Sequence, residues 1–229
     1  MGTRAGRIPI FDAVLQGPKA VARLLRTAPG SCQERMLVDY LDPSVGHWLY
    51  VGDTSLHLAA AALRVDEAKL LLRSGADPNA ENRRRATPLH YACDPRPKSS
   101  VPWSPAAQTG MIALLVDQGA DVDRADRGGA TPLHRAVRAR SPGAVRQLLA
   151  LGARPDPRLG QRGSSPLHLA VQSTGAGGTA GSRDEQMEII ALLLRRGADP
   201  AARDAAGHTP RDRAKNERVR AALGLAGTG

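Results

Sequence analysis

Histidine is the residue type whose placement in this sequence first suggests chemistry, because imidazole is a common metal ligand and a general acid or base near neutral pH. Four of the six histidines stand at the same position of a recurring hexapeptide, namely His57, His90, His134 and His168. Their spacing of one repeat is too wide for a shared zinc ion with bonds of about 2 Å. His47 and His208 have no paired ligands in the sequence and are expected in loops. The histidines therefore predict no metal site.

Two further segments resemble sites only superficially. Residues 175–181 are rich in glycine, but they lack the Gly-Lys-Ser/Thr ending of a phosphate loop, and Ala180 stands where a dinucleotide motif needs glycine. A flexible linker is the better interpretation of this segment. Asp121 and Asp123 follow a Gly-Ala pair and are expected to make turn and helix-cap hydrogen bonds.

The thiols give no sign of a redox or zinc site. Cys32 and Cys93 are 61 residues apart and form no Cys-x-x-Cys motif, so neither a disulfide framework nor a thiolate zinc site is supported. Since no nucleophile signature is present either, we predict a protein without cofactor, metal or enzymatic activity. The alternative is an enzyme whose site is built in inserted segments, around His47 or Cys32.

The hexapeptide marks the expected start of a helix at each copy. Clear copies begin at Thr54, Thr87, Thr131 and Ser165, and weaker ones lie at residues 8–13 and 209–214. Ser or Thr suits the cap of a helix N-terminus, and proline fits the first helical position, where no N–H donor is needed. Each clear copy precedes an aliphatic segment with i, i+3, i+4 spacing and a Gly-Ala pair that suits a left-handed helix end. The chain is therefore expected to consist of repeated helix pairs.

This repeated unit resembles the ankyrin repeat, in which a β-turn finger precedes two antiparallel helices in about 33 residues. The resemblance covers nearly the whole chain, from about Ile8 to Leu223. It implies an all-α fold, an ankyrin-repeat solenoid of about six helix-turn-helix units in which stacking supplies the core. It also implies that each motif imidazole hydrogen-bonds the hydroxyl of the capping residue and the backbone of the adjacent finger.

We expect these repeats to form a single domain over residues 1–229. Its expected parts are an N-terminal capping unit with a long finger loop (1–52), four repeat units (53–86, 87–130, 131–164 and 165–208), a degenerate C-terminal cap (209–224) and a tail (225–229). Arg211 and Asp212 replace the Leu and His of the motif in the last copy, as expected of a terminal repeat that faces water.

Two of the repeat units carry insertions. Successive capping residues are 33, 44, 34 and 44 residues apart, and the excess of eleven residues lies between the helices of the units that begin at Thr87 and Ser165. The finger between Pro29 and Thr54 is stretched as well. Loops carried on a rigid scaffold commonly hold function, so these insertions are candidate contact surfaces.

Aromatic residues follow the insertions. Four of the six lie in inserted segments, namely Tyr40, Trp48, Tyr50 and Trp103. Because Trp and Tyr are enriched at binding hot spots, these side chains are candidates for partner contact. The alternative is that Trp48 and Trp103 anchor their own loops on the solenoid.

The charge is strongly basic, with 32 basic against 22 acidic residues, and 28 of the basic residues are arginine. Arginine pairs with carboxylates and phosphates, so one interpretation is an acidic partner. The other is a GC-rich genome, because Ala, Gly and Pro are abundant too, and this composition favours a bacterial source. The resemblance places fingers and inner helices on a concave surface, where many of the arginines would lie.

The sequence therefore predicts a non-catalytic scaffold that binds a protein partner, one with an acidic segment, through the concave surface and the inserted loops. The candidate contact residues are Trp48, Tyr50, Arg83, Arg84, Arg85, Trp103, Arg124, Arg127, Arg135 and Arg138. The alternative is a nucleic acid or another polyanion on the same arginines, although the interleaved aromatics of a nucleic-acid groove are missing. A self-associating or purely structural module is a third interpretation.

Two absences bear on location. No apolar run reaches the roughly 18 residues of a membrane span, and the N-terminal residues lack the apolar region of a signal peptide. We expect a cytoplasmic monomer with no membrane partner.

Overall fold

The computed structural model describes residues 8–43, 45–94, 104–172 and 183–225. The chain divides into two compact units, an N-terminal unit of residues 1–121 and a C-terminal unit of residues 122–229. Both extensions between helices fall largely on residues 95–103 and 173–182, so the predictions made for them, Trp103 included, lie outside the described residues.

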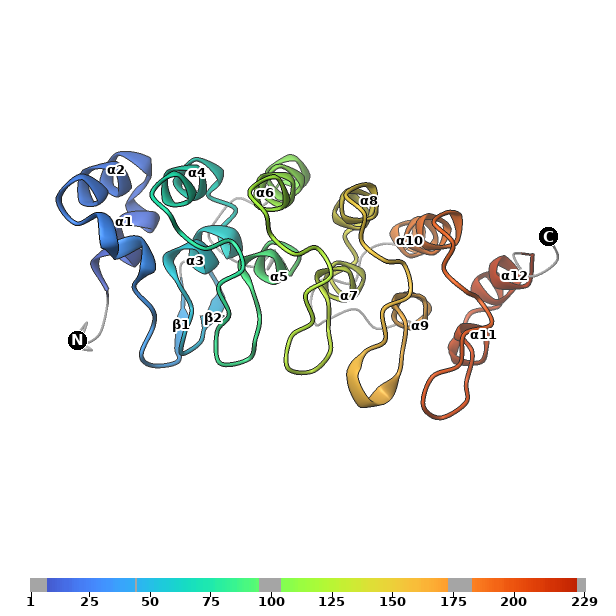
Figure 1. Ribbon diagram of the computed structural model, residues 1–229. Coiled ribbons are helices and arrows are strands. Elements are labelled where there is room, and N and C mark those ends of the chain that lie inside the picture. Colours follow the sequence, from blue (N-terminus) through green and yellow to red (C-terminus); the bar gives the residue numbers. More distant parts are fainter. Residues whose placement is uncertain (1–7, 44, 95–103, 173–182, 226–229) are drawn as a thin grey trace. The chain divides into compact units, whose positions relative to one another are not determined.

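The N-terminal unit is a stack of helix pairs, with one row of helices above the other (Figure 1). The inner row holds α1 (Pro9–Gln16), α3 (Ser55–Ala61) and α5 (Pro88–Ala92), and the outer row holds α2 (Pro18–Thr27), α4 (Val65–Arg73) and α6 (Pro105–Asp117). Between the first two pairs lie a 3-10 helix, η1 (Pro29–Gln33), and two short strands, β1 (Tyr40–Asp42) and β2 (His47–Leu49).

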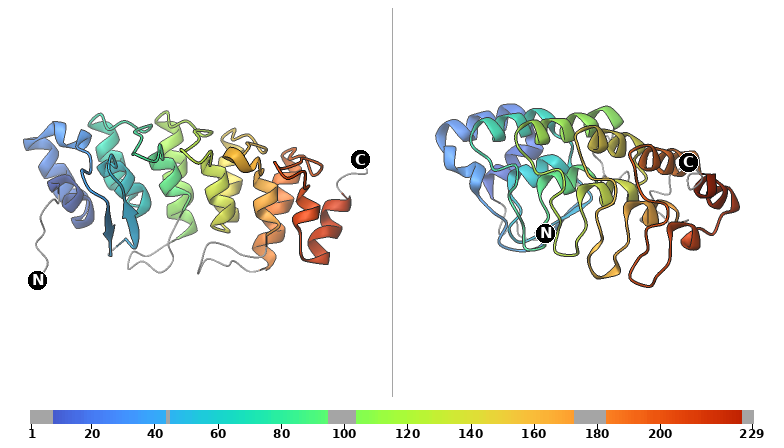
Figure 2. Two further views of the ribbon diagram at one scale, coloured as in Figure 1. Left: turned by 90° about the horizontal axis from the view of Figure 1, so that it is seen from below. Right: turned by 45° about the vertical axis from the view of Figure 1, so that its right-hand side comes forward.

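The C-terminal unit repeats the same arrangement, and its fingers project as loops in Figure 2. Its elements are α7 (Pro132–Arg138), α8 (Pro142–Ala150), η2 (Gly160–Arg162), α9 (Pro166–Ala170), α10 (Arg183–Arg195), α11 (Pro210–Arg213) and α12 (Glu217–Leu225). Helices thus dominate the described residues of both units, and the predicted all-α repeat solenoid is confirmed.

Every clear hexapeptide copy starts a helix through the same capping box. In α3, the Thr54 N–H and hydroxyl both reach His57 Nδ1, at 3.1 and 3.0 Å. The opposite ring nitrogen, Nε2, lies 3.1 Å from the carbonyl oxygen of Ala86 in the next finger. Equivalent capping boxes begin α5, α7 and α9. The role that the family resemblance implied for the motif histidines is confirmed for the capping hydroxyl in all four copies, and for the finger backbone at His57, His134 and His168.

The core lies between the two rows of helices, where the aliphatic spacing placed it. The motif leucines Leu56, Leu89, Leu133 and Leu167 are fully buried. On the outer helices, Leu71, Leu115, Leu148 and Leu193 are also fully buried. At the last copy, Arg211 and Asp212 are exposed, and Asp212 takes the place of histidine in the capping box by accepting a hydrogen bond from the Thr209 N–H at 2.8 Å.

The stretched finger differs from the expected plain loop. Its strands β1 and β2 pair antiparallel as a hairpin, in which Leu41 pairs with Trp48 and Asp42 with His47. The prediction that His47 lies in a loop is wrong, because it is a buried residue of β2. Three alternating residues are too few to indicate a strand in the sequence.

Candidate functional site

The hairpin of the N-terminal unit has one buried face and one exposed face. Asp42, His47 and Leu49 point inward and are almost fully buried. Their strand neighbours Leu41 and Trp48 point outward, and each is 45% exposed. Since successive side chains of a strand point to opposite faces, the inward residues anchor the hairpin and leave Trp48 available on the surface.

The anchor is a buried polar and aromatic cluster beneath the hairpin. The His47 ring lies against the Tyr91 ring of α5, with centroids 4.6 Å apart. The Tyr91 hydroxyl donates to Asp53 Oδ2 at 2.7 Å, and the Asn82 amide donates to Asp53 Oδ1 at 2.9 Å. These bonds join Asp53, which follows the hairpin, to the next finger and to α5. The hairpin therefore packs, through His47, on a hydrogen-bonded base.

Exposed apolar side chains gather at this hairpin. Among the residues that the structure describes, the large apolar side chains that stand out as exposed are Leu37, Val38, Leu41 and Trp48. We call these four residues the hairpin patch. Leu37, at 82%, is the most exposed of the four. Of these four residues, only Trp48 was selected from the sequence. Leu37 and Val38 were a signal too, because two consecutive aliphatic residues in a finger lie away from the helices that form the core.

The arginines of the neighbouring finger lie beside Tyr50. The Arg84 guanidinium stacks over the Tyr50 ring at 4.1 Å from its centroid, and Arg83 lies at 5.7 Å. Arg83 also pairs with Asp39, and Arg85 pairs with Glu81 at 3.3 Å. The structure therefore brings Tyr50, Arg83 and Arg84 together, while part of their charge is neutralised within the chain.

Of the arginines predicted as contacts in the C-terminal unit, Arg135 and Arg138 line a hollow, and Arg124 and Arg127 do not. Arg135 pairs with Asp126 at 2.8 Å, and both side chains are mostly buried. Arg138 is exposed at the end of α7. Together with Arg135, it lines a hollow that Arg124 and Arg127 do not reach. Asp123, next to Arg124, forms an ion pair with Arg154, whose Nε lies 3.0 Å from Asp123 Oδ2.

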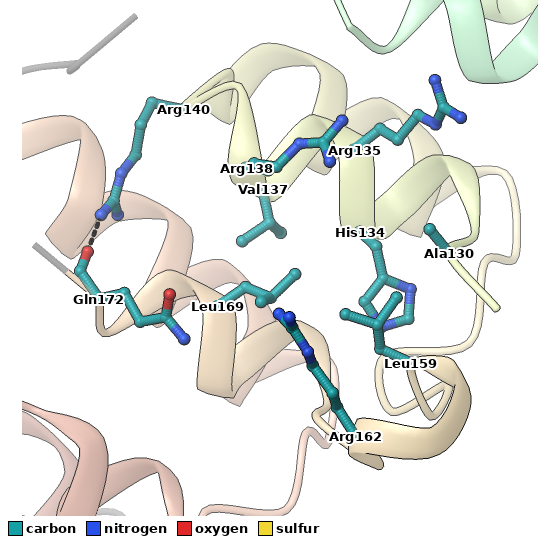
Figure 3. A pocket seen from close by; sticks show the side chains of 10 residues that line it. All are labelled: Ala130, His134, Arg135, Val137, Arg138, Arg140, Leu159, Arg162, Leu169 and Gln172. Carbon is teal, nitrogen blue, oxygen red and sulfur yellow. Dashed lines mark hydrogen bonds between the residues drawn. The ribbon is translucent and has the colours of Figure 1, made fainter. Parts of the chain in front are cut away.

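This hollow has a volume of about 270 Å³ and lies between α7, the finger that contains η2, and α9 (Figure 3). We call it the arginine hollow, and it is lined by the four arginines Arg135, Arg138, Arg140 and Arg162 and by the aliphatic residues Val137, Leu159 and Leu169, among others. Arg140 and Arg162 were not singled out from the sequence. Their signal was present in the abundance of arginine, but their convergence depends on how α7 packs on the next finger.

Burial shifts the pKa values of two motif histidines and of Cys32 toward their neutral forms. His134 is buried, and this desolvation lowers its pKa to about 4, so the ring is neutral at pH 7. Burial also lowers the pKa of His57. The Cys32 thiol is buried, its pKa is raised by desolvation, and its Sγ donates to the Ser74 carbonyl oxygen at 3.2 Å. A raised pKa disfavours the thiolate that a nucleophile needs.

The described residues contain no group of three or more His, Cys, Asp or Glu side chains arranged to hold a metal ion. None of the helices in the described ranges has both the length and the apolar character needed to cross a membrane.

Comparison with known proteins agrees with the repeat geometry. The family model described as "Ankyrin repeats (3 copies)" matches residues 104–204, and the model "Ankyrin repeat" matches residues 51–83. Together these matches cover three of the capping boxes described above, those that begin at Thr54, Thr131 and Ser165.

The curated relatives are animal proteins. Mouse "Ankyrin repeat and SOCS box protein 16" is 33% identical over 203 residues, which is 75% of this chain and 41% of that protein. The Drosophila melanogaster "Neurogenic locus Notch protein" is 56% identical over 41 residues, and the Xenopus laevis "Neurogenic locus notch homolog protein 1" is 54% identical over 41 residues. These two matches cover 18% of this chain and 2% of either protein. The chain spans less than half the length of each relative.

Proposed function

Because the chain belongs to the ankyrin-repeat family, whose members are generally non-catalytic protein-interaction modules, we propose that it is a scaffold that binds a protein partner. Contact is made through surfaces of the individual units rather than through an enclosed pocket. The hairpin patch, with Tyr50, Arg83 and Arg84 beside it, is the principal contact surface of the N-terminal unit.

One observation carries this proposal, the concentration of exposed apolar side chains at a single hairpin. Exposed apolar residues scattered singly over a surface need no explanation, whereas a contiguous group marks an interaction site. Here Leu41 and Trp48 are cross-strand partners, and Leu37 and Val38 lie just before β1. The anchored inner face holds this group in place, so little conformational entropy is lost when a partner binds.

The arginines supply the second element of the proposal, a preference for a partner with an acidic segment. We propose Arg85, Arg124, Arg127, Arg135 and Arg138 as further contacts on the finger and inner-helix surfaces of their units, with Trp103 contributing from its insertion. Replacing Arg84, Arg127 and Arg138 with Glu is expected to abolish partner capture with little change in the melting temperature. Unaltered capture by this variant would remove the arginines from the proposal.

Binding to a nucleic acid or another polyanion is the second candidate, and the formal net charge of +10 favours it. Against it, Arg83, Arg85 and Arg135 are each paired with a carboxylate of the chain. A polyanion binder loses affinity steeply with salt, with a slope that follows the number of phosphates neutralised. A shallow salt dependence of oligonucleotide binding would discard this candidate.

The remaining features of the proposal concern the state of the protein. We propose that it has no enzymatic activity, acts in the cytoplasm as a monomer and has no membrane partner. Both cysteines are buried, and neither forms a disulfide within the described residues, which fits a reducing compartment. The bacterial source stays a prediction from composition.

A photo-crosslinking experiment tests the proposal. Replacing Leu41 with p-benzoylphenylalanine places the crosslinker on the hairpin patch, and the same replacement at Arg26, an exposed residue of α2, is the control. Irradiation in a lysate of the source organism is expected to give a discrete adduct with another protein from position 41 and none from position 26. Adducts of equal pattern from both positions would refute the hairpin patch as a contact surface.

A further inference from the structure

The arginine hollow exists where one repeat lacks a side-chain bridge that its neighbours have. Five residues before and four residues after the capping residue, the units that begin at Thr87, Thr131 and Thr209 carry a polar pair that ties the finger to the inner helix, whereas the first unit has Leu49 and Leu58 there. In the unit that begins at Thr131, the pair is Asp126 and Arg135, 2.8 Å apart. In the last unit, Asp204 Oδ2 accepts a hydrogen bond from Arg213 Nε at 2.9 Å.

The unit that begins at Ser165 has Gly160 and Leu169 at these two positions. Gly160 has a positive φ of 40°, and a Cβ added there would collide with the Gly128 carbonyl oxygen of the preceding finger. An aspartate is therefore excluded by the close approach of two backbones. Without a bridge, Leu169 is half-buried and faces the hollow together with Leu159 of the finger (Figure 3).

The cations around this apolar floor come from two elements. Arg162 lies in the finger, its side chain is exposed, and within the described residues its guanidinium has no hydrogen bond or ion pair. Arg138 is exposed on α7, on the opposite side of the hollow (Figure 3). None of the residues that line the hollow is Asp or Glu.

A third cation is buried at the edge of the hollow. Arg140 is only 7% exposed and has a positive φ of 57°. Its guanidinium donates to the carbonyl oxygen of Ala170 at 2.8 Å and to that of Gln172. Carbonyl oxygens satisfy its N–H groups, and the carboxylate of Glu185 interacts with its charge, so Arg140 is a partly neutralised cation at the edge of the hollow.

We propose that the arginine hollow binds a short segment of a protein partner in which a carboxylate side chain stands next to an aliphatic one. The aliphatic group packs on Val137, Leu159 and Leu169, and the carboxylate pairs with Arg162 and Arg138. This proposal rests on the proposed function, because it names the chemistry of the partner at a second surface.

The lining favours such a segment over a nucleic acid. A hollow of about 270 Å³ is the size of a few side chains and has an aliphatic floor, which gains free energy only from an apolar occupant. No Trp, Tyr or Phe lines it to stack with a base. A guanidinium group can donate two parallel hydrogen bonds to one carboxylate. This geometry favours a segment whose carboxylate is held at a fixed position relative to the aliphatic floor.

The test uses the full chain, labelled with ¹⁵N, and three capped octapeptides with Gly-Ser ends. Their central four residues are Leu-Glu-Leu-Glu, Leu-Gln-Leu-Gln and Ser-Glu-Ser-Glu. The first peptide is expected to give saturable shifts confined to residues 134–140 and 159–172, with affinity about tenfold above either of the others, because it alone supplies both groups. Equal binding of the Gln peptide, or shifts elsewhere only, would overturn the proposal.

Matched variants locate the site. Arg162→Ala removes an exposed cation of the hollow, and Arg196→Ala removes an exposed cation outside the hollow, in the turn that follows α10. The first is expected to weaken the Leu-Glu peptide about tenfold and the second to leave its affinity unchanged. Leu169→Glu places a carboxylate of the chain on the floor and is expected to abolish peptide binding. Equal affinities for all variants would reject the hollow as the site.

Two further readouts separate this proposal from the others. Stronger binding of a short oligothymidylate than of the Leu-Glu peptide at the same residues would overturn the proposal in favour of a polyanion site. Failure of the peptide titration alone, with the Leu41 crosslink intact, would reject the hollow and leave the protein-binding function standing. Loss of the crosslink alone would reject the hairpin patch and leave the hollow.

Discussion

The hairpin patch and the arginine hollow are opposite departures from one repeat. In the N-terminal unit the finger gained residues, and the added strand pair exposes Leu41 and Trp48 on a buried base. In the C-terminal unit the finger before Ser165 lacks the polar bridge of its two neighbours, with Gly160 and Leu169 in its place, and a hollow lies there between arginines. A repeat scaffold therefore acquires distinct surfaces both by insertion and by deletion of a local contact, since each repeat depends only on its neighbours.

The two faces of the hairpin should differ most in their effect on stability. Leu49→Ala removes a buried anchor and is expected to lower the free energy of unfolding by about 2–4 kcal/mol. Leu41→Ala on the outer face is expected to change it by less than about 0.5 kcal/mol. Urea denaturation followed by circular dichroism measures both. Similar losses for the two variants would show that the hairpin has no free face.

The close approach of backbones at the hollow should make Gly160 the most sensitive glycine of its finger. Gly160→Ala is expected to cost about 1–3 kcal/mol, because its Cβ meets a carbonyl oxygen and its φ is positive. Gly30→Ala in the N-terminal unit is the control, since a Cβ there meets nothing within 4 Å and φ is not positive. Thermal melts compare the two variants. A neutral Gly160→Ala would mean that the fingers separate easily.

Acid should weaken the capping boxes of both units. Desolvation lowers the pKa of His134 from 6.5 to about 4, so the unfolded chain takes up a proton between these values and the folded chain does not. The stability from this residue is complete above about pH 6.5 and declines as the pH falls, by about 2 kcal/mol at pH 5. Urea midpoints at pH 7, 6 and 5 measure the change. A midpoint that stays constant to pH 5 would contradict neutral, buried imidazoles.

The smallest expected effect concerns the surface of the hollow. Arg162→Ala is expected to change the free energy of unfolding by less than about 0.5 kcal/mol, because the exposed guanidinium has no partner in the described part of the chain. Asp126→Asn, which breaks the mostly buried pair with Arg135, is expected to cost more than Arg162→Ala. Chemical denaturation ranks the two. The reverse order would indicate that Arg162 is structural.

Much of the fold could be predicted from the residues. The Ser or Thr cap, the proline and the histidine of each hexapeptide locate a helix start because they act within four residues of one another. The candidate site was less predictable. Trp48 was selected because of its residue type, but its exposure depends on the register of a hairpin that local propensity did not reveal.

The sequence by itself determined the repeat, the helix starts and the structural role of the motif histidines, since these follow from short-range hydrogen bonds and periodic burial. Only the tertiary structure decided which arginines are neutralised and which converge. Arg135 meets Asp126 and Arg140 meets Ala170 because segments separated along the chain pack together. Long-range packing, unlike capping, leaves no fixed spacing in the sequence. Surfaces for a partner therefore emerge only when the repeats are stacked.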